Sequence, residues 1–445
     1  MRSIIVGGGK LGILIAEFLI REKHDVVVIE TNEENFAALE DKLDVSVIHG
    51  NGASSAILDA AGVSRADLLL AVTGSDEINM VACMLGKQAG VENAVARVSN
   101  PEYLEEKTSG ASFLSGIDLI INPELQTAQE IADLIDVPEA IDVMYYADET
   151  AMVLELPISE ESPVSGFSLK DLRMESPFLI VAIARKNEII IPRGDDEIMP
   201  GDVIYLLAGT HDMLNVESFL GIERKHTENV VVLGGGRTGG HMARLFAGKD
   251  FCVRIVEKDY QKCEALAEAF PRVLVIHGDA GELDLLKQEG AGKADVFIGV
   301  TDDDKVNLLA CIIAKHLGAK KTIALVREAE YVDIMAGIGI DINVSQRALT
   351  ANAIHRFVKR SANLLSFTLL RDEEVGLLEF IVQPGSRTVG RRLKDIRFPK
   401  GAIVGSIQRE GALIIAKGDD KLELGDKVTI FCLPKASDRV IALLR

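Results

Sequence analysis

Two glycine-rich segments of this 445-residue chain contain the residues best suited to bind a ligand. "IIVGGGKLG" and "VVVLGGGRTGG" each join a run of apolar β-forming residues to Gly-x-Gly-x-x-Gly, and apolar residues at helical spacing follow. The glycines are Gly7, Gly9, Gly12, Gly234, Gly236 and Gly239. In such a turn the first glycine permits the bend, the second lets the backbone approach a pyrophosphate, and the third lets the helix pack on the strand. The N–H groups of the helix N-terminus then face the phosphates, so each segment predicts a dinucleotide site.

An acidic residue ends the next apolar run after each glycine-rich turn. Glu30 ends "DVVVIE" and Glu257 ends "CVRIVE", at the same distance beyond the third glycine. A carboxylate at the tip of the second strand accepts hydrogen bonds from a ribose 2′-hydroxyl and repels a 2′-phosphate. The pattern therefore favours NAD(H) over NADP(H). A glycine-rich turn that binds nothing stays open as the alternative for either copy.

The elements that must position these residues can be recognised from their apolar periodicity. Short apolar runs predict strands at 3–6, 25–29, 45–48, 67–72, 94–98 and 118–121. Helical spacing predicts helices at 10–22, 34–42, 53–61, 76–89, 101–110 and 123–135. This alternation indicates a right-handed, doubly wound parallel sheet, which binds ligands at the carboxyl ends of its strands. The polar candidates there for contacts with an adenine or a ribose include Asn51, Thr73, Ser75, Asp76 and Asn79, and in the second copy Asp279, Thr301, Asp302, Asp303, Asp304 and Asn307. For Ser75 and Asp76 the favoured alternative is that they cap the helix that follows.

The whole pattern occurs twice along the chain. Gly50 and Thr73 recur as Gly278 and Thr301 at a constant separation, and a shorter β-rich segment follows each copy. We therefore predict an α/β protein with two tandem Rossmann-like, doubly wound parallel sheets, each followed by a small α+β domain. The predicted large domains are residues 1–135 and 228–360, and the predicted small domains are residues 140–222 and 366–445.

Charge and composition narrow the class of protein. A formal net charge of -20, with no Lys/Arg-rich run recognised, argues against a nucleic-acid partner, because phosphate-binding surfaces need a basic patch. No apolar run is long enough to span a bilayer, and an apolar strand follows the N-terminus directly, which predicts a cytoplasmic protein without a signal peptide. An acidic protein would suit the Lys/Arg-rich cytoplasmic loops of a membrane partner.

Together these features resemble a known family. The chain is similar to the TrkA regulatory subunits of Trk potassium-uptake systems, which consist of two RCK (also called KTN) domains, each followed by a TrkA-C domain. The resemblance rests on "IIVGGGKLG" with Glu30, on "VIHGNGASSAIL", "ADLLLAVTGSDEINMVACMLGK" and "ARVSNPEY", and on their counterparts in the second copy. The segments "MPGDVIYLLAG" and "LELGDKVTIFCL" add to it, and it covers essentially the whole chain.

The resemblance implies regulation rather than catalysis. Such subunits lie on the inner face of the cell membrane against a Trk-type potassium channel or transporter, bind NAD(H) or adenine nucleotides such as ATP and ADP, and change the activity of the pore. It further implies a homo-oligomer, a dimer or tetramer of tandem chains that forms a ring. Carried over by position, the cofactor-binding residues of the first copy are Gly7, Gly9, Lys10, Leu11, Gly12, Glu30, Asn51, Ala53, Thr73 and Arg97. Those of the second copy are Gly234, Gly236, Arg237, Thr238, Gly239, Glu257, Asp279, Ala280, Thr301 and Arg327.

The chain departs from the family pattern at two places. The family usually has Gly-Asp after the third strand, where the first copy has Asn51 and the second keeps Asp279. An amide still accepts a hydrogen bond, so we expect altered reading of the base in the first copy. The family's Ala-Arg-Val-Arg strand retains only Arg97 in the first copy and only Arg327 in the second, which predicts two sites of different affinity or nucleotide preference. A surface ion pair is the alternative role for either arginine.

Other classes of function stay open on the sequence alone. A nicotinamide dehydrogenase needs a catalytic acid or base, but His49 and His277 lie beside the expected adenine rather than near hydride chemistry. A nucleotide sensor with a soluble partner fits the same motifs. We identify no catalytic residue and no metal site, and we expect the five widely spaced cysteines to be small buried hydrophobes. A pocket for a second effector in the small domains is left open.

Overall fold

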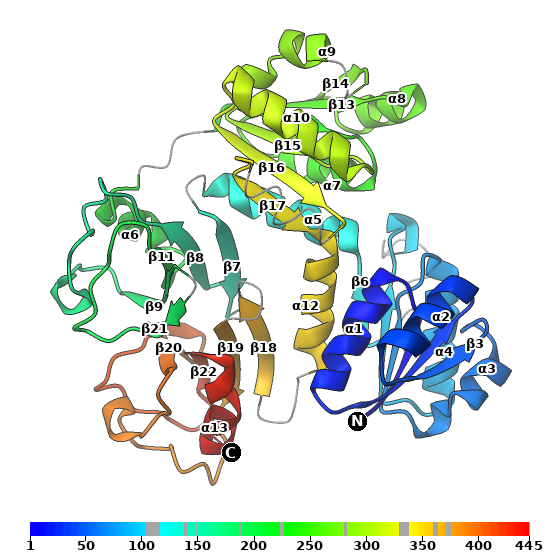
Figure 1. Cartoon of the computed structure of the whole chain (residues 1–445). Coiled ribbons are helices and arrows are strands. Elements are labelled where there is room, and N and C mark those ends of the chain that lie inside the picture. Colours follow the sequence, from blue (N-terminus) through cyan, green and yellow to red (C-terminus); the bar gives the residue numbers. More distant parts are fainter. Residues whose placement is uncertain are drawn as a thin grey trace. The chain divides into compact units, whose positions relative to one another are not determined.

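A computed structural model describes residues 1–103, 116–137, 140–147, 149–186, 188–222, 227–279, 283–328, 338–358, 364–370 and 375–444 (Figure 1). The chain divides into two compact units: the first comprises Met1–Gln129, Leu325–Ala329 and Ser345–Ile354, and the second comprises the remaining residues. Among the described helices, none is both long enough and apolar enough to cross a membrane.

A six-stranded parallel sheet forms the centre of the first unit, with strand order β3-β2-β1-β4-β5-β6 (Figure 1). Its strands are β1 (Arg2–Val6), β2 (Asp25–Glu30), β3 (Ser46–His49), β4 (Leu68–Ala71), β5 (Asn93–Arg97) and β6 (Leu119–Ile121). The central strands are nearly continuous runs of buried Val, Ile, Leu and Ala, as parallel strands covered on both faces require. The strand order reverses between β1 and β4, so ligands are expected at the carboxyl ends of these two strands.

Helices connect consecutive strands of this sheet and cover both of its faces. They are α1 (Lys10–Arg21), α2 (Glu33–Lys42), α3 (Ser55–Ala60) and α4 (Asp76–Gln88), with 3-10 turns η1 (Val63–Arg65) and η2 (Pro101–Tyr103). The helix α5 (Pro123–Asp136) follows the last strand and leads to the first small domain. Ile4 and Val6 of β1 share one buried cluster with Leu58 of α3 and Met80 of α4, whereas α1 packs with its own buried side chains against β1 and β2. Beyond η2, the predicted helix at 101–110 lies outside the described residues.

The second α/β copy repeats this design, with strand order β14-β13-β12-β15-β16-β17. Its strands are β12 (Asn229–Leu233), β13 (Cys252–Glu257), β14 (Leu274–His277), β15 (Val296–Gly299), β16 (Lys321–Val326) and β17 (Ile342–Ser345). Its helices are α7 (Arg237–Phe246), α8 (Tyr260–Ala269), α9 (Leu283–Gln288), α10 (Asp304–Leu317) and α12 (Gln346–Val358), with the 3-10 turn η5 (Ala291–Lys293). The prediction of two tandem, doubly wound parallel sheets is confirmed.

The small domains were predicted to be β-rich α+β domains, and each contains a five-stranded antiparallel sheet, with orders β10-β9-β11-β8-β7 and β18-β19-β22-β20-β21. The first consists of β7 (Asp142–Tyr146), β8 (Ala151–Pro157), η4 (Leu169–Asp171), β9 (Phe178–Arg185), β10 (Glu188–Ile190), β11 (Val203–Gly209) and α6 (Met213–Phe219). The second consists of β18 (Leu364–Leu370), β19 (Val375–Ile381), η6 (Leu393–Asp395), β20 (Ala402–Arg409), β21 (Ala412–Ile415), β22 (Lys427–Cys432) and α13 (Pro434–Leu444).

The two small domains share a buried core within the second unit. Val153 and Tyr205 of the first small domain belong to the same hydrophobic cluster as Leu377 and Phe431 of the second. The ring of Tyr146 packs edge-on against Phe431 with centroids 6.5 Å apart. One chain therefore pairs its own small domains through the apolar faces of their sheets.

The cysteines follow the expectation at four of their five positions. Cys83, Cys263, Cys311 and Cys432 are buried, and burial raises the pKa of the Cys83 and Cys311 thiols to about 12. Cys252 is exposed, so the expectation was wrong there. The reason is its place as the first residue of β13, outside the packed centre of the sheet.

Candidate nucleotide-binding sites

The first glycine-rich turn joins β1 to α1 at the carboxyl edge of the sheet. Gly7 has a φ of 107°, which L side chains rarely adopt, and a Cβ there would lie 3.0 Å from the backbone nitrogen of Thr73. A Cβ on Gly12 would lie 1.9 Å from the carbonyl oxygen of Gly7, so glycine is needed for α1 to approach β1 this closely. A Cβ on Gly9, the N-cap of α1, would meet nothing within 4 Å. No side chain caps α1, so its N-terminal N–H groups face open space, as phosphate binding requires.

The second glycine-rich turn has the same geometry. Gly234 again has a φ of 107°, and a Cβ on Gly239 would lie 2.0 Å from the carbonyl oxygen of Gly234. Gly236 is the N-cap of α7, has no side-chain cap, and would carry a Cβ without any neighbour within 4 Å. Both turns therefore fit the pyrophosphate of a dinucleotide or the phosphates of an adenine nucleotide.

Gly12→Ala should lower the free energy of unfolding by about 1–3 kcal/mol, because its methyl group would overlap the Gly7 carbonyl oxygen. Gly9→Ala is the matched control; alanine is a poorer N-cap than glycine but meets no neighbour there, so this change should lower that free energy by less than about 1 kcal/mol. Denaturant titration followed by circular dichroism measures both. Equal stabilities of the two variants would contradict the close approach of α1 to β1.

The two acids at the ends of β2 and β13 do more than the sequence predicted. Glu30 is buried, and its Oε2 accepts a hydrogen bond from the backbone N–H of Gly8 at 2.7 Å, while its Oε1 accepts from the N–H groups of Thr31 at 2.6 Å and Asn32 at 2.7 Å. Glu257 likewise accepts from the N–H of Gly235 at 2.7 Å. Each acid therefore fixes the middle of its glycine-rich turn. A carboxylate oxygen accepts two hydrogen bonds, so Oε2 keeps acceptor capacity for a ribose hydroxyl.

NADP(H) should bind at least about tenfold more weakly than NAD(H), a difference of about 1.4 kcal/mol. The reason is that a 2′-phosphate would approach the buried carboxylates of Glu30 and Glu257, which are already held by backbone donors. Calorimetric competition between NADPH and NADH for the purified chain measures the ratio of the two affinities. Equal affinities would remove the ribose role from both residues.

The candidate polar residues after β4 and β15 have two different roles. Asn79 is fully buried; its Oδ1 accepts from the N–H of Thr73 at 2.9 Å and from Thr73 Oγ1 at 2.7 Å, and its Nδ2 donates to the carbonyl oxygen of Arg97 at 2.9 Å. Asn307 makes the same two contacts with Thr301 at 2.8 Å and 2.7 Å. Thr73 and Thr301 border the glycine-rich turns, whereas Asn79 of α4 and Asn307 of α10 hold these threonines in place through their hydrogen bonds.

The loop after β3 also lies close to the glycine-rich turn. Asn51 is exposed, and its Oδ1 accepts from the N–H of Ala53 at 2.9 Å, which forms a local turn. A Cβ on Gly52 would lie 2.1 Å from Val6 Cγ1, so the loop backbone approaches β1 closely here. The sequence analysis did not include Gly52. A glycine directly after the polar Asn51 was the signal that could have identified it. Asp279 is exposed at the equivalent place in the second copy, and Ala280 lies outside the described residues.

The cationic candidates differ between the copies. Arg97, at the end of β5, is half-buried, and its Nη2 lies 3.9 Å from Oε1 of the buried Glu124. Arg327 is half-buried directly after β16. Lys10 and Arg237 are exposed as the first residues of α1 and α7, beside the open N-termini. Of the residues that follow them, Leu11 is half-buried and Thr238 is buried.

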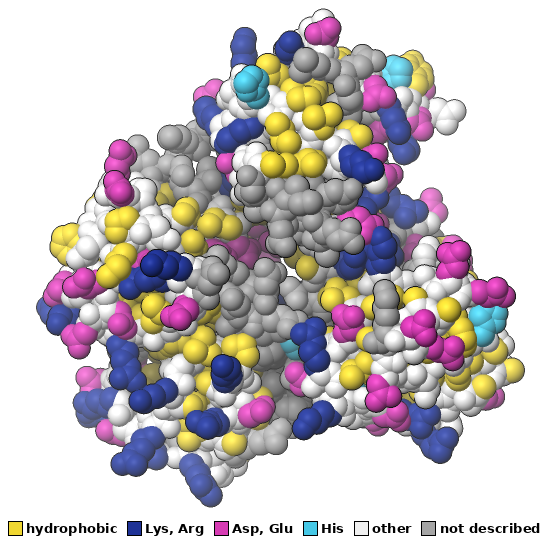
Figure 2. All heavy atoms as spheres, viewed as in Figure 1, with side chains coloured by type: hydrophobic (Ala, Val, Ile, Leu, Met, Phe, Trp, Pro, Cys, Tyr) yellow, Lys and Arg dark blue, Asp and Glu magenta, His cyan; other side chains and the backbone are white. Residues whose placement is uncertain are grey.

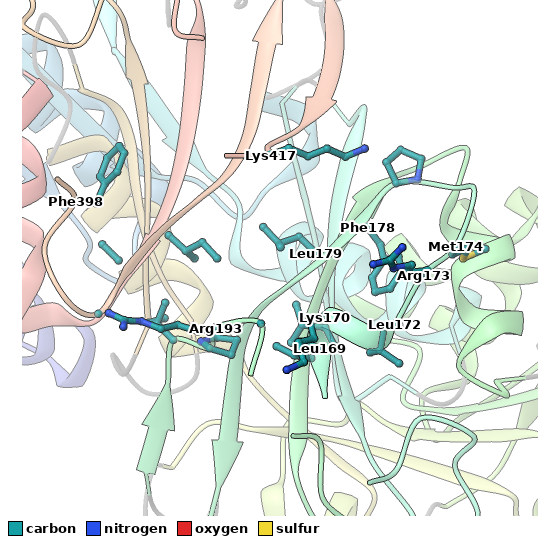
Figure 3. Close-up of a pocket in the computed structure, with 18 of the residues that line it drawn as sticks. Leu169, Lys170, Leu172, Arg173, Met174, Phe178, Leu179, Arg193, Phe398 and Lys417 are labelled. Carbon is teal, nitrogen blue, oxygen red and sulfur yellow. The ribbon is translucent and has the colours of Figure 1, made fainter. Parts of the chain in front are cut away.

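A separate pocket of about 780 Å³ lies between the two small domains. Apolar side chains from both domains line it, Leu172 and Leu179 from the first and Phe398 from the second, as Figure 3 shows. Its Lys and Arg residues outnumber its one acid, Glu175, and they are Lys170, Arg173, Arg193, Lys400 and Lys417. An apolar wall with excess positive charge suits an organic anion. The sequence left open a pocket for a second effector, including a cation held by carboxylates, without naming residues; the excess of Lys and Arg in this lining does not favour a cation.

Positive charge also gathers outside the pocket. On the face shown in Figure 2, many Lys and Arg side chains lie over the second small domain, despite the net charge of -20. The sequence expectation of no Lys/Arg-rich run was wrong for one segment, since the exposed residues Arg391, Arg392, Lys394, Arg397 and Lys400 follow closely on one another. These cations lie on the 3-10 turn η6 and the loop residues around it, between β19 and β20.

A duplicated Rossmann-type domain, with an uncapped helix N-terminus in each copy and a small β-rich domain after each, defines a class of tandem nucleotide-binding proteins. The model of the TrkA-N domain matches residues 3–123 and 230–346, and that of the TrkA-C domain matches residues 153–221 and 377–445. The chain therefore belongs to the TrkA family of Trk system potassium uptake proteins, and the resemblance predicted from the sequence is confirmed.

Individual relatives agree with this assignment. A Trk system potassium uptake protein TrkA homolog of Methanosarcina mazei is 36% identical over 99% of both chains, and TrkA of Vibrio alginolyticus is 32% identical over 98% of this chain and 96% of its own. Among solved structures, a GsuK channel bound to NAD aligns with a TM-score of 0.65 at 16% identity, covering 100% of this chain and 78% of that one. GsuK bound to ADP aligns with a TM-score of 0.52 at 16% identity, over 80% and 69%. At these identities the two structures show a shared fold.

Proposed function

We propose that this protein is a regulatory subunit of a Trk-type potassium channel or transporter and that bound NAD(H), ATP or ADP controls potassium uptake. The observation that carries the proposal is the pair of helix N-termini at Gly9 and Gly236, uncapped and open to a phosphate, in a chain of the TrkA family. Its relatives belong to Trk potassium-uptake systems, and GsuK, which shares the fold, binds NAD and ADP.

Nucleotide acts here as a signal and is released unchanged. In support of this, four ionisable side chains around the turns make hydrogen bonds or close polar contacts with the backbone. Glu30 and Glu257 accept backbone hydrogen bonds, and the imidazole Nε2 atoms of His49 and His277 lie 2.9 Å and 3.1 Å from the carbonyl oxygens of Thr31 and Lys258. Groups held in this way orient loops rather than exchange protons with a substrate carbon.

The protein acts at the inner face of the cell membrane against a membrane-embedded potassium-conducting subunit, and its chains assemble into a ring of two or four. Support for this partner comes from the family and from charge, because the net charge of -20 complements the Lys/Arg-rich cytoplasmic loops of membrane proteins. Nucleotides shift the equilibrium between two conformations through different affinities for them, and about 1–3 kcal/mol per coupled pair of sites is enough to alter gating.

The test is reconstitution of this protein with a Trk-type pore in liposomes. Potassium flux is measured with NADH, NAD⁺, ATP and ADP, while each nucleotide is assayed for turnover. We expect flux to depend on which nucleotide is present and the nucleotides to be recovered intact. Flux that ignores every nucleotide would overturn the regulatory role, and oxidation of NADH in proportion to a small substrate would instead establish a dehydrogenase.

A further inference from the structure

The cation of the first glycine-rich turn is held by an acid from the second copy of the repeat. Lys10 follows Gly9 directly, and its Nζ donates hydrogen bonds to both carboxylate oxygens of Glu328. Glu328 follows Arg327, a predicted cofactor residue of the second copy, and belongs to the same compact unit as Lys10. The side chain of Lys10 is 62% exposed, so it can turn toward another anion without unpacking a core.

A second cation contacts the same carboxylate. Arg347, in the first turn of α12, has its Nη2 4.0 Å from Glu328 Oε2. The hydrogen bond from Lys10, and then the charges of Lys10 and Arg347, hold the pKa of Glu328 below its usual value, which keeps this acid ionised at neutral pH. If Lys10 turns away, Arg347 still offsets the negative charge.

Phosphates at the first turn would meet this arrangement directly. They would lie at the N-terminus of α1, beside Lys10, and would compete with Glu328 for the same ammonium group. A fixed carboxylate nearby also repels the ligand, and this repulsion grows with ligand charge from a dinucleotide to a diphosphate to a triphosphate. The chain does not repeat this acid at the equivalent position of the first copy, where Asn100 corresponds to Glu328.

We propose that Glu328 is a specificity-determining residue of the first nucleotide site, which competes with phosphate for Lys10 and lowers affinity most for the most highly charged nucleotides. This inference rests on the proposed nucleotide function. The affinity of the first site then depends on the charge of the ligand. When a phosphate binds Lys10, Glu328 loses Lys10 and keeps Arg347, so binding at the first site changes the contacts of the Arg327–Glu328 segment of the second copy.

The test uses the full chain with the second site disabled by Gly236→Asp, and calorimetric titration with ATP, ADP and NAD⁺ at about 50 mM salt. Glu328→Gln should raise the affinity for ATP by about three- to tenfold, raise that for ADP less, and change that for NAD⁺ by less than about twofold. The gain should shrink at about 0.5 M salt, where charges are screened. Glu40→Gln removes an equal charge from an exposed position of α2 and should leave all three affinities unchanged.

A double-mutant cycle separates competition for Lys10 from a general effect of charge. Lys10→Gln should weaken ATP binding, and adding Glu328→Gln to it should restore little, because the group that the two anions share is then absent. An unchanged ATP affinity in Glu328→Gln, or a gain as large in the Lys10→Gln background, would overturn the inference. If the unmodified chain binds none of the three nucleotides, the proposed function itself fails, and this result is distinct from a failure of Glu328 alone.

Discussion

Gly9→Asp should abolish nucleotide binding at the first site and leave the second site occupied. The new side chain would enter the open space above α1, where Gly9 leaves nothing within 4 Å of a Cβ, and its carboxylate would accept hydrogen bonds from the helix N-terminus in place of a phosphate. We expect an affinity loss of at least about 100-fold, or about 2.7 kcal/mol. Calorimetric stoichiometry should fall from two nucleotides per chain to one.

This variant should lose its ligand without losing its fold. Aspartate is a favoured N-cap residue, so the change should keep or raise the stability of α1, by up to about 1 kcal/mol. Gly236→Asp is the matched variant of the second copy and should remove the other site, while Gly9→Ala should keep both. If Gly9→Asp or Gly236→Asp alone removed all binding, the two sites would not be independent. The two glycine-rich turns would then act as one coupled site.

The sequence predicted the parts of the site that depend on local backbone geometry. Three glycines at fixed spacing after an apolar run leave few alternatives to a strand, a tight turn and a helix, and Gly7, Gly9 and Gly12 have the conformation, the open space and the close approach that this geometry needs. The fold could be predicted for the same reason, because short apolar strand runs alternate with helices of period 3.6 through both copies.

Features that depend on contacts between distant segments could not be predicted. The sequence placed Glu30 at a strand end, but its hydrogen bond to Gly8 exists only because β1 and β2 are neighbours in register. The ion pair of Lys10 with Glu328 and the pocket between Arg193 and Phe398 join segments of different repeats, and no local pattern marks such partners. Asn79 gave a signal of another kind: a polar residue on the helix face that otherwise carries the buried Met80 and Cys83.

Asn79→Leu should destabilise the first α/β domain by about 3 kcal/mol or more and weaken nucleotide binding there. All the hydrogen-bonding capacity of the buried amide is used: Oδ1 accepts twice from Thr73, and Nδ2 donates to the carbonyl oxygens of Thr73 at 3.1 Å and Arg97 at 2.9 Å. An isosteric leucine leaves several of these buried groups without a partner, at about 1–3 kcal/mol each.

Binding should fall together with stability because Asn79 holds Thr73 against the glycine-rich turn, where a Cβ added to Gly7 would lie 3.0 Å from the Thr73 nitrogen. Denaturant titration and calorimetry with NADH measure the two effects on one sample. Asn307→Leu should reproduce both in the second copy, whereas Asn215→Leu, at an exposed position of α6, should change stability by less than about 0.5 kcal/mol. If Asn79→Leu lowers stability but leaves the affinity for NADH unchanged, Thr73 does not contribute to the site. If it changes neither quantity, the hydrogen bonds of Asn79 support neither the fold nor binding.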